Sequence, residues 1–199
     1  MERAVKLILA SGNAGKLAEL RRLLEPLGID LESQAALGIA PAAETRSTFV
    51  ENALDKARHA SRESGLPALA DDSGLVVPML GGAPGIRSAR YAGDDADDDA
   101  NNAKLIAALG DAREPAAHFY CALVLLRHPE DPAPLVATGR WDGRILGEPR
   151  GDGGFGYDPL FLVPGAGCTA AELPAAEKNR LSHRGQAMAM LLESLRAEV

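Results

Sequence analysis

A six-residue segment near the start of the chain has the composition of a phosphate-binding loop. Ser11-Gly12-Asn13-Ala14-Gly15-Lys16 follows a short β-prone run and precedes leucines at helical spacing. Backbone N–H groups and the helix dipole would therefore point at whatever binds there, and the two glycines let the main chain approach it closely. Lys16 adds a positive charge at the same place. The pattern predicts phosphate binding, and an ordinary strand-to-helix turn with a solvated lysine is the alternative.

The spacing within this segment differs from that of a P-loop. A Walker A motif has four residues between its first glycine and the Gly-Lys pair, and a Ser or Thr after the lysine holds magnesium. Here only Asn13 and Ala14 intervene, and Leu17 follows Lys16. A P-loop kinase or GTPase is therefore disfavoured, and a metal would have to be held by other residues.

Two acidic residues after a short apolar run are candidates for that metal. Asp71 and Asp72 precede Ser73-Gly74 and follow a segment that is predicted to be a buried strand. Adjacent residues of an extended segment point to opposite sides, so at most one carboxylate faces a site shared with Lys16. Magnesium prefers oxygen ligands, and a carboxylate beside a bound metal can accept a proton from an attacking water. The alternative is a turn, for which the same four residues are well suited.

A further acidic candidate lies ahead of a predicted helix. Ser47 or Thr48 can cap that helix, and Glu51 stands at capping-box spacing from Thr48. Glu44 lies earlier in the loop and has no such structural duty, so it could join an acidic metal site.

Residues near the C-terminus have the types needed to bind a nucleotide base. An aromatic ring can stack on a base, an aspartate can read base or sugar hydrogens, and His and Arg can donate to a base carbonyl. Phe155 is equally suited to the core, and Arg184 could instead pair with a carboxylate at the start of the last helix. The candidates are Phe155, Gly156, Tyr157, Asp158, Lys178, Ser182, His183 and Arg184.

The acidic run Gly93 to Asp99 does not match a calcium loop. Counting from Asp94 places Asp99 where an EF-hand needs glycine and Leu105 where it needs glutamate. Acidic side chains at the start of a helix interact favourably with its dipole, and this interpretation accounts for the run.

Strands and helices interleave along the chain. Strands are predicted at 5–10, 30–33, 66–70, 119–126, 135–145 and 160–163, and helices at 16–24, 48–64, 98–109 and 182–197. This alternation favours an α/β or mixed α+β sheet with flanking helices, in which ligands collect at the carboxyl ends of strands.

Length, charge and cysteine usage narrow the class of protein. A chain of 199 residues with 46% hydrophobic content can form one domain over residues 1–199. The net charge of -7 argues against attachment to nucleic acid or an anionic membrane. No apolar run approaches the ~20 residues that span a bilayer. Cys121 and Cys168 form no C-x-x-C pair and no signal peptide is evident, so a cytoplasmic location is expected, with Cys121 buried.

Six motifs, in this order, resemble one family. The chain is similar to the inosine/xanthosine triphosphate pyrophosphatases, the RdgB/HAM1-like house-cleaning enzymes, over nearly its full length. The motifs are Ser-Gly-Asn-x-Gly-Lys from Ser11, Glu-Thr-x-x-Thr-Phe-x-Glu-Asn-Ala from Glu44, Ala-Asp-Asp-Ser-Gly-Leu from Ala70, Gly-Gly-x-Pro-Gly-x-x-Ser-Ala-Arg-Tyr from Gly81, Gly-Gly-Phe-Gly-Tyr-Asp-Pro from Gly153 and Ser-His-Arg-Gly-Gln-Ala from Ser182.

The resemblance implies an activity and a general architecture. It implies hydrolysis of XTP, ITP and dITP to the monophosphate and pyrophosphate by a magnesium-dependent cytoplasmic homodimer. It also implies an elongated mixed β-sheet with flanking helices, in two lobes around a central substrate cleft. Two rival functions stay open, namely a pyrophosphatase for other modified or pyrimidine nucleotides and a nucleotide-binding sensor without turnover.

The resemblance also assigns roles to individual residues. Ser11 to Lys16 would bind the triphosphate, Asp72 would be metal ligand and general base, Glu44 would be a second metal ligand, and Ser73 would touch the substrate. Arg46 departs from the glycine that is usual in the family, and Arg87 from an aromatic or aliphatic residue. The residues that would bind base and phosphates are Phe155, Gly156, Tyr157, Asp158, Lys178, His183 and Arg184.

Overall fold

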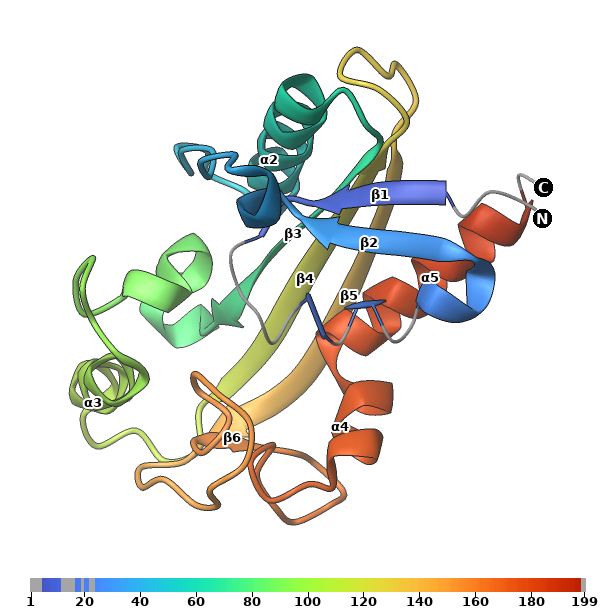
Figure 1. The fold of residues 1–199 in the computed structure, drawn as a ribbon. Coiled ribbons are helices and arrows are strands. Elements are labelled where there is room, and N and C mark those ends of the chain that lie inside the picture. Colours follow the sequence, from blue (N-terminus) through green and yellow to red (C-terminus); the bar gives the residue numbers. More distant parts are fainter. Residues whose placement is uncertain (1–4, 12–16, 19, 22–23, 198–199) are drawn as a thin grey trace. The chain divides into compact units, whose positions relative to one another are not determined.

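Six strands form one mixed sheet in this computed structural model, which describes residues 5–11, 17–18, 20–21 and 24–197 (Figure 1). The strand order is β2-β1-β3-β4-β5-β6. β1 is parallel to β2 and β3, whereas β6 is antiparallel to β5. This arrangement confirms the predicted mixed α/β class. The strands are β1 (Val5–Leu9), β2 (Ile29–Ser33), β3 (Ala68–Val76), β4 (Ala116–Leu126), β5 (Leu135–Ile145) and β6 (Phe161–Leu162).

Helices α2 to α5 accompany the sheet, together with short 3-10 turns. The described residues 17, 18, 20, 21 and 24 are helical as well and fall within the helix predicted at 16–24. The capping box of α2 is confirmed, because Thr48 Oγ1 accepts from the Glu51 amide at 3.2 Å and donates to the Glu51 carboxylate at 2.7 Å. None of the helices in the described ranges is long and apolar enough to cross a membrane. The helices are α2 (Phe49–Ser64), α3 (Asp98–Leu109), α4 (Ala175–Leu181) and α5 (His183–Ala197), and the 3-10 turns are η1 (Glu25–Leu27), η2 (Gln34–Leu37), η3 (Pro78–Leu80) and η4 (Gly85–Arg90).

The structure corrects two sequence predictions. β3 continues through Asp71, Asp72, Ser73 and Gly74 to Val76, so the turn alternative for these four residues is wrong. Residues Asp71 and Asp72 are buried, and a strand satisfies their backbone groups where an isolated turn would leave them without partners. Helix α4 was not predicted, because its seven residues are too few to show a clear helical period.

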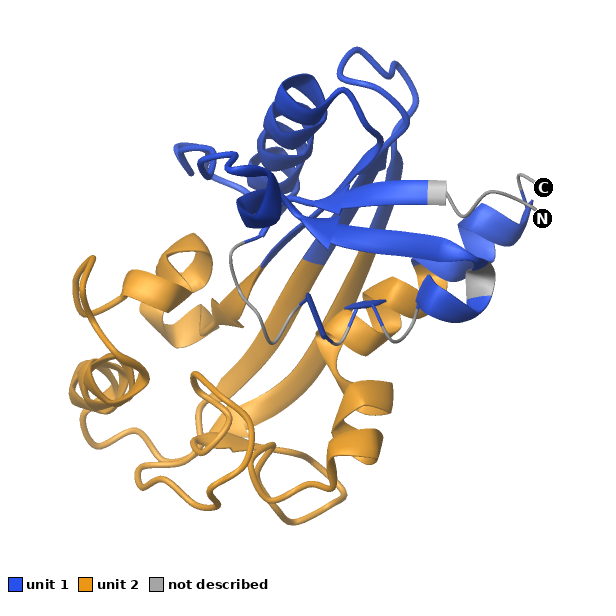
Figure 2. Cartoon of the chain, in the orientation of Figure 1, with its two compact units in different colours: residues 1–72, 122–137, 191–199 blue, residues 73–121, 138–190 orange. Residues whose placement is uncertain are grey.

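The chain divides into two compact units, shown in different colours in Figure 2. Unit 1 comprises residues 1–72, 122–137 and 191–199, and unit 2 comprises residues 73–121 and 138–190. Strands β3, β4 and β5 each contribute residues to both units. The single domain over residues 1–199 stays a prediction beside this division.

In unit 1, helix α2 packs against strand β1. The helix buries Ala53, Ala57 and Ala60, which recur at helical spacing and let the helix approach closely because their side chains are small. Ile8 and Leu9 of β1 are fully buried. This packing fixes the helix that carries one residue of the candidate site.

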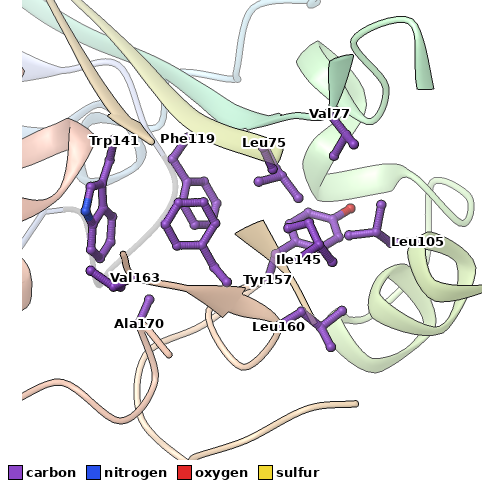
Figure 3. Packing of buried hydrophobic residues seen from close by; sticks show 12 residues of the cluster. Leu75, Val77, Leu105, Phe119, Trp141, Ile145, Tyr157, Leu160, Val163 and Ala170 are labelled. Atoms are coloured by element: carbon purple, nitrogen blue, oxygen red, sulfur yellow. The ribbon is translucent and has the colours of Figure 1, made fainter. Parts of the chain in front are cut away.

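In unit 2, an aromatic cluster forms the centre of the core (Figure 3). The ring centroids of Phe119 and Phe161 lie 4.6 Å apart, and those of Trp141 and Phe161 lie 5.1 Å apart. Helix α3 joins this core through Leu105, with Ile106 and Leu109 packed against its edge. Both α3 and the loop that leads into β6 are therefore held by the same core.

Helix α5 approaches β5 most closely at Gly139. A Cβ atom there would overlap the His183 carbonyl oxygen and lie 2.7 Å from the Ala187 amide nitrogen. Because both neighbours are backbone atoms of α5, they cannot move without shifting the start of the helix.

We expect Gly139→Ala to destabilise the protein by about 1–3 kcal/mol, since it overpacks a rigid contact. Urea unfolding monitored by circular dichroism measures the change. Gly147→Ala is the matched control, because a Cβ at Gly147 has no heavy atom within 4 Å. Equal stability of the two variants would show that α5 can move away from β5 at little cost.

Candidate functional site

Two carboxylates of unit 1 meet at one ammonium group, whose side chain is 14% exposed. Lys56 Nζ donates to Asp72 Oδ1 at 2.8 Å and also forms an ion pair with Glu44 Oε1. The same nitrogen lies 3.4 Å from the Asp71 carbonyl oxygen. We call Glu44, Lys56 and Asp72 the acid–lysine cluster. The structure thus brings together the two residues that were predicted to hold a metal.

The loop that carries Glu44 is fixed on helix α2 by Arg46. The Arg46 amide donates to Asn52 Oδ1 at 3.0 Å, and Asn52 Nδ2 lies 3.4 Å from the Arg46 carbonyl oxygen. The Arg46 guanidinium pairs with Asp55 at 2.6 Å. Arg46 therefore anchors this loop to the helix, and Glu44 still reaches Lys56.

Burial and ion pairing act in opposite directions on the pKa values of this cluster. Burial raises the pKa of Asp72 above its ordinary value, although the Lys56 charge and hydrogen bond oppose this. Burial alone would lower the pKa of Lys56, but its hydrogen bonds and attraction to Asp72 and Glu44 outweigh this effect and the pKa is raised. Lys56 therefore carries a full positive charge beside the two carboxylates.

Asp72 retains one oxygen without a hydrogen-bond partner. The Oδ2 atom is buried, and no described residue donates to it. A buried carboxylate oxygen without a donor costs free energy unless a cation or another donor supplies the missing interaction. The donor set of Asp72 and Glu44 therefore fits a hard divalent cation.

The sequence prediction did not include Lys56, although the sequence contains a signal for it. Lys56 follows Ala53 by three residues and precedes Ala60 by four, so it borders the apolar face of the helix. A charged side chain beside that face is removed from water and therefore needs a group of opposite charge. Nothing in the sequence identifies the partner as Asp72, because the pairing depends on how α2 lies against β3.

Unit 2 contains an aromatic and charged cluster at the glycine-rich loop. Lys178 Nζ pairs with Asp158 Oδ2 and lies 5.1 Å from the centroid of the Phe155 ring. The Arg184 guanidinium lies 5.8 Å from the same centroid. Phe155 is 53% exposed, so the alternative that placed it in the core is wrong. We call Phe155, Asp158, Lys178 and Arg184 the base-platform cluster.

The first residues of α5 contribute two more candidates. Arg184 is 4% exposed, and its Nη2 atom donates to Ser73 Oγ at 3.2 Å. The ring of His183 stacks on Phe119 with centroids 4.9 Å apart and planes at 13°. These contacts fix both side chains and bring Ser73 of β3 next to Arg184.

Tyr157 and Ser88 connect the glycine-rich loop to strand β3. The Tyr157 hydroxyl donates to the Ser88 carbonyl oxygen at 2.9 Å, and burial raises the pKa of Tyr157 so that this donor stays protonated. Ser88 Oγ accepts from the Leu75 amide at 2.9 Å and donates to the Gly85 carbonyl oxygen at 2.6 Å. A Cβ at Gly74 would overlap Ser88 Oγ, which explains glycine at that position.

Part of the predicted phosphate site lies outside the described residues. Ser11 is described and half-buried, whereas Gly12, Asn13, Ala14, Gly15 and Lys16 are not among the described residues. Cys121 is buried, as expected from its apolar run, and the described residues form no disulfide with it.

A mixed α/β fold that carries a pair of carboxylates and an exposed aromatic ring beside two cationic side chains is typical of an enzyme that acts on nucleotides. More specifically, the chain belongs to the Ham1 family, whose sequence model matches residues 7–194. The chain is 58% identical to the dITP/XTP pyrophosphatase of Ralstonia nicotianae over 194 residues, which cover 96% of each chain. It is 60% identical to the protein of the same name from Xanthomonas campestris over 193 residues, covering 96% of this chain and 97% of that one.

A solved structure agrees with the sequence comparison. The structure of a HAM1 protein from Coxiella burnetii matches with a TM-score of 0.92 and 48% sequence identity, and the match covers 98% of this chain and 100% of that one. The family resemblance predicted from the six motifs is therefore confirmed.

We expect Tyr157→Phe to destabilise the protein by about 0.5–1.5 kcal/mol, because it removes a buried hydrogen bond while keeping the ring. Tyr91→Phe is the matched control, since the Tyr91 ring rather than its hydroxyl contacts Lys104 at 4.7 Å. We expect the control to change stability by less than about 0.5 kcal/mol. Thermal unfolding of both variants measures the difference, and an unaffected Tyr157→Phe would contradict the tether to Ser88.

Proposed function

We propose that this chain is a dITP/XTP pyrophosphatase, which hydrolyses XTP, ITP and dITP to the monophosphate and pyrophosphate and so removes them from the nucleotide pool. The observation that carries the proposal is the convergence of Glu44 and Asp72 on one ammonium, in a chain whose close relatives bear that name. A buried Asp72 with one oxygen that lacks a donor among the described residues, beside the partly exposed Glu44, is suited to metal-assisted attack on a phosphate.

Magnesium is the cofactor that we propose. Asp72 and Glu44 would hold it, because magnesium commonly binds through one or two carboxylates and completes its shell with waters and substrate phosphates. Bound magnesium would neutralise charge on the phosphate oxygens and make a bound water more acidic.

The residues of the chain would have separate roles in the reaction. Asp72 would accept a proton from the water that attacks the α-phosphorus. Lys16 and the amides of its loop would offset negative charge on the departing pyrophosphate. No covalent intermediate is proposed, since a water beside the metal-bound carboxylate would be the nucleophile.

Base selection would depend on the base-platform cluster and its neighbour His183. The Phe155 ring is exposed and can stack on a purine. His183 and Arg184 are donors, and donors suit the 6-keto oxygen of hypoxanthine and xanthine. Adenine presents an amino group there, so the donors would be left unpaired and ATP would be disfavoured.

We also propose that the enzyme is a cytoplasmic homodimer that binds neither nucleic acid nor membranes. The net charge of -7 supports this view, because a negative surface repels both polyanionic partners. The homodimer is inferred from the family resemblance.

The proposal is tested by incubating purified protein with ITP, GTP or ATP, with and without magnesium. We expect pyrophosphate and IMP from ITP only when magnesium is present, and much slower turnover of GTP and ATP. Orthophosphate as the first product would contradict the proposal. So would tight ITP binding without any pyrophosphate release, which would favour a nucleotide sensor.

The role of Asp72 is tested by Asp72→Asn, which keeps the shape but removes the charge. We expect kcat for ITP to fall by about 10²–10⁴-fold, because both the metal ligand and the proton acceptor are lost. Asp111→Asn, at an exposed position beyond α3, is the control and should retain wild-type turnover. Circular dichroism of both variants establishes that they are folded. Near wild-type kcat in a folded Asp72→Asn variant would refute the role.

A further inference from the structure

The first two turns of helix α3 hold both backbone groups of Gly156. Asp98 Oδ2 accepts from the Gly156 amide at 2.6 Å, and Asn102 Nδ2 donates to the Gly156 carbonyl oxygen at 3.0 Å. Asp98 and Asn102 are four residues apart and so lie on one face of the helix. This contact gives Asp98 a role beyond the helix dipole, to which the acidic run was attributed.

The residue before Gly156 is fixed from its other side as well. The Phe155 amide donates to Asp158 Oδ2 at 2.8 Å, and Lys178 neutralises that carboxylate. The Phe155 backbone is therefore held at its own amide and at the next residue. Phe155 remains 53% exposed, so an apolar surface is presented on a fixed backbone.

Helix α3 is itself firmly supported within unit 2. Leu105 is fully buried in the aromatic core, and Asp97 caps the helix by accepting from the Ala100 amide at 2.8 Å. Asn101 Oδ1 accepts from the Ala92 amide at 2.8 Å, which ties the helix to the segment before it. A helix held at three points can keep the glycine-rich loop in one conformation.

Asn102 carries a buried polar group that lowers the stability of the fold. It is 9% exposed, and its Oδ1 atom has no donor among the described residues. Burying an unsatisfied amide oxygen destabilises the fold, and leucine has a similarly branched side chain without that cost. The amide therefore makes sense for the bond that its nitrogen donates to Gly156.

We infer that Asp98 and Asn102 are positioning residues that set the Phe155 ring for stacking on the purine base. They act through Gly156 and control the binding of the base, while the chemical step depends on the acid–lysine cluster. The inference rests on the proposed function in one respect, because it takes the ligand of Phe155 to be a nucleotide.

The test compares Asp98→Ala, Asp98→Asn and the control Asp99→Ala, each folded by circular dichroism. We expect Asp98→Ala to raise KM for ITP about tenfold, which corresponds to one charged hydrogen bond, with kcat changed less than twofold. Asp98→Asn keeps an acceptor oxygen for the Gly156 amide and should restore KM to within about threefold. Asp99→Ala, in the same turn, should behave as wild type.

A double-mutant cycle with Phe155→Ala separates positioning from a direct or merely structural effect. If Asp98 acts through the Phe155 ring, Asp98→Ala adds no further loss of ITP affinity once that ring is removed. Isothermal titration with ITP in the absence of magnesium measures these affinities without turnover. Additive losses, or a fall in kcat at unchanged KM, would overturn the inference.

Hydrogen exchange provides a readout that is independent of activity. We expect the Gly156 amide to exchange faster in Asp98→Ala than in wild type, with Asp99→Ala unchanged. Unchanged exchange at Gly156 would overturn the inference even in an active enzyme. A wild-type protein that binds ITP but releases no pyrophosphate would instead contradict the proposed function, and the titration cycle would still test the positioning role.

Discussion

The ammonium group of Lys56, placed against two carboxylates, is the interaction on which the candidate catalytic residues of unit 1 depend. A buried Asp72 would be costly by itself, since the charged form loses its hydration. Lys56 offsets that cost and also collects Glu44 from a loop. The three side chains come from a loop, a helix and a strand, so the packing of α2 and the extent of β3 are both constrained by this one charge.

A comparable constraint acts on the glycine-rich loop of unit 2. The loop contains too many glycines to hold one conformation by itself, because glycine allows a wider range of backbone conformations than any other residue. Its shape is imposed by polar contacts from outside, through Tyr157 to Ser88 and through Asp98 and Asn102 to Gly156. The flexible sequence permits close approach, and the surrounding elements select one arrangement.

The departures from the family pattern are local. Arg46 replaces a small residue in the loop before α2, yet its guanidinium finds Asp55 and its backbone finds Asn52 on that helix. The substitution therefore adds a connection between loop and helix. Nothing in the described contacts explains why arginine stands at position 87, where the family usually has an aromatic or aliphatic residue.

The sequence by itself determined the elements whose signals are periodic or local. Helix α3 and strand β5 have the predicted limits, and the capping residue Thr48 was identified with its partner Glu51. These features depend on neighbours within one turn or one strand, so their information is contained in a short window. The order of the motifs was also sufficient to indicate the family.

Only the tertiary structure decided which distant residues meet. The sequence could not show that Lys56 contacts Asp72, or that Asp98 contacts Gly156, because such pairs are set by how a helix packs and not by spacing along the chain. The sequence also could not place Asp72 within a strand, because Asp-Asp-Ser-Gly favours a turn when it is exposed to water. In the structure these four residues belong to strand β3. Long-range packing therefore determines that Asp72 pairs with Lys56 and that Asp98 accepts a hydrogen bond from Gly156.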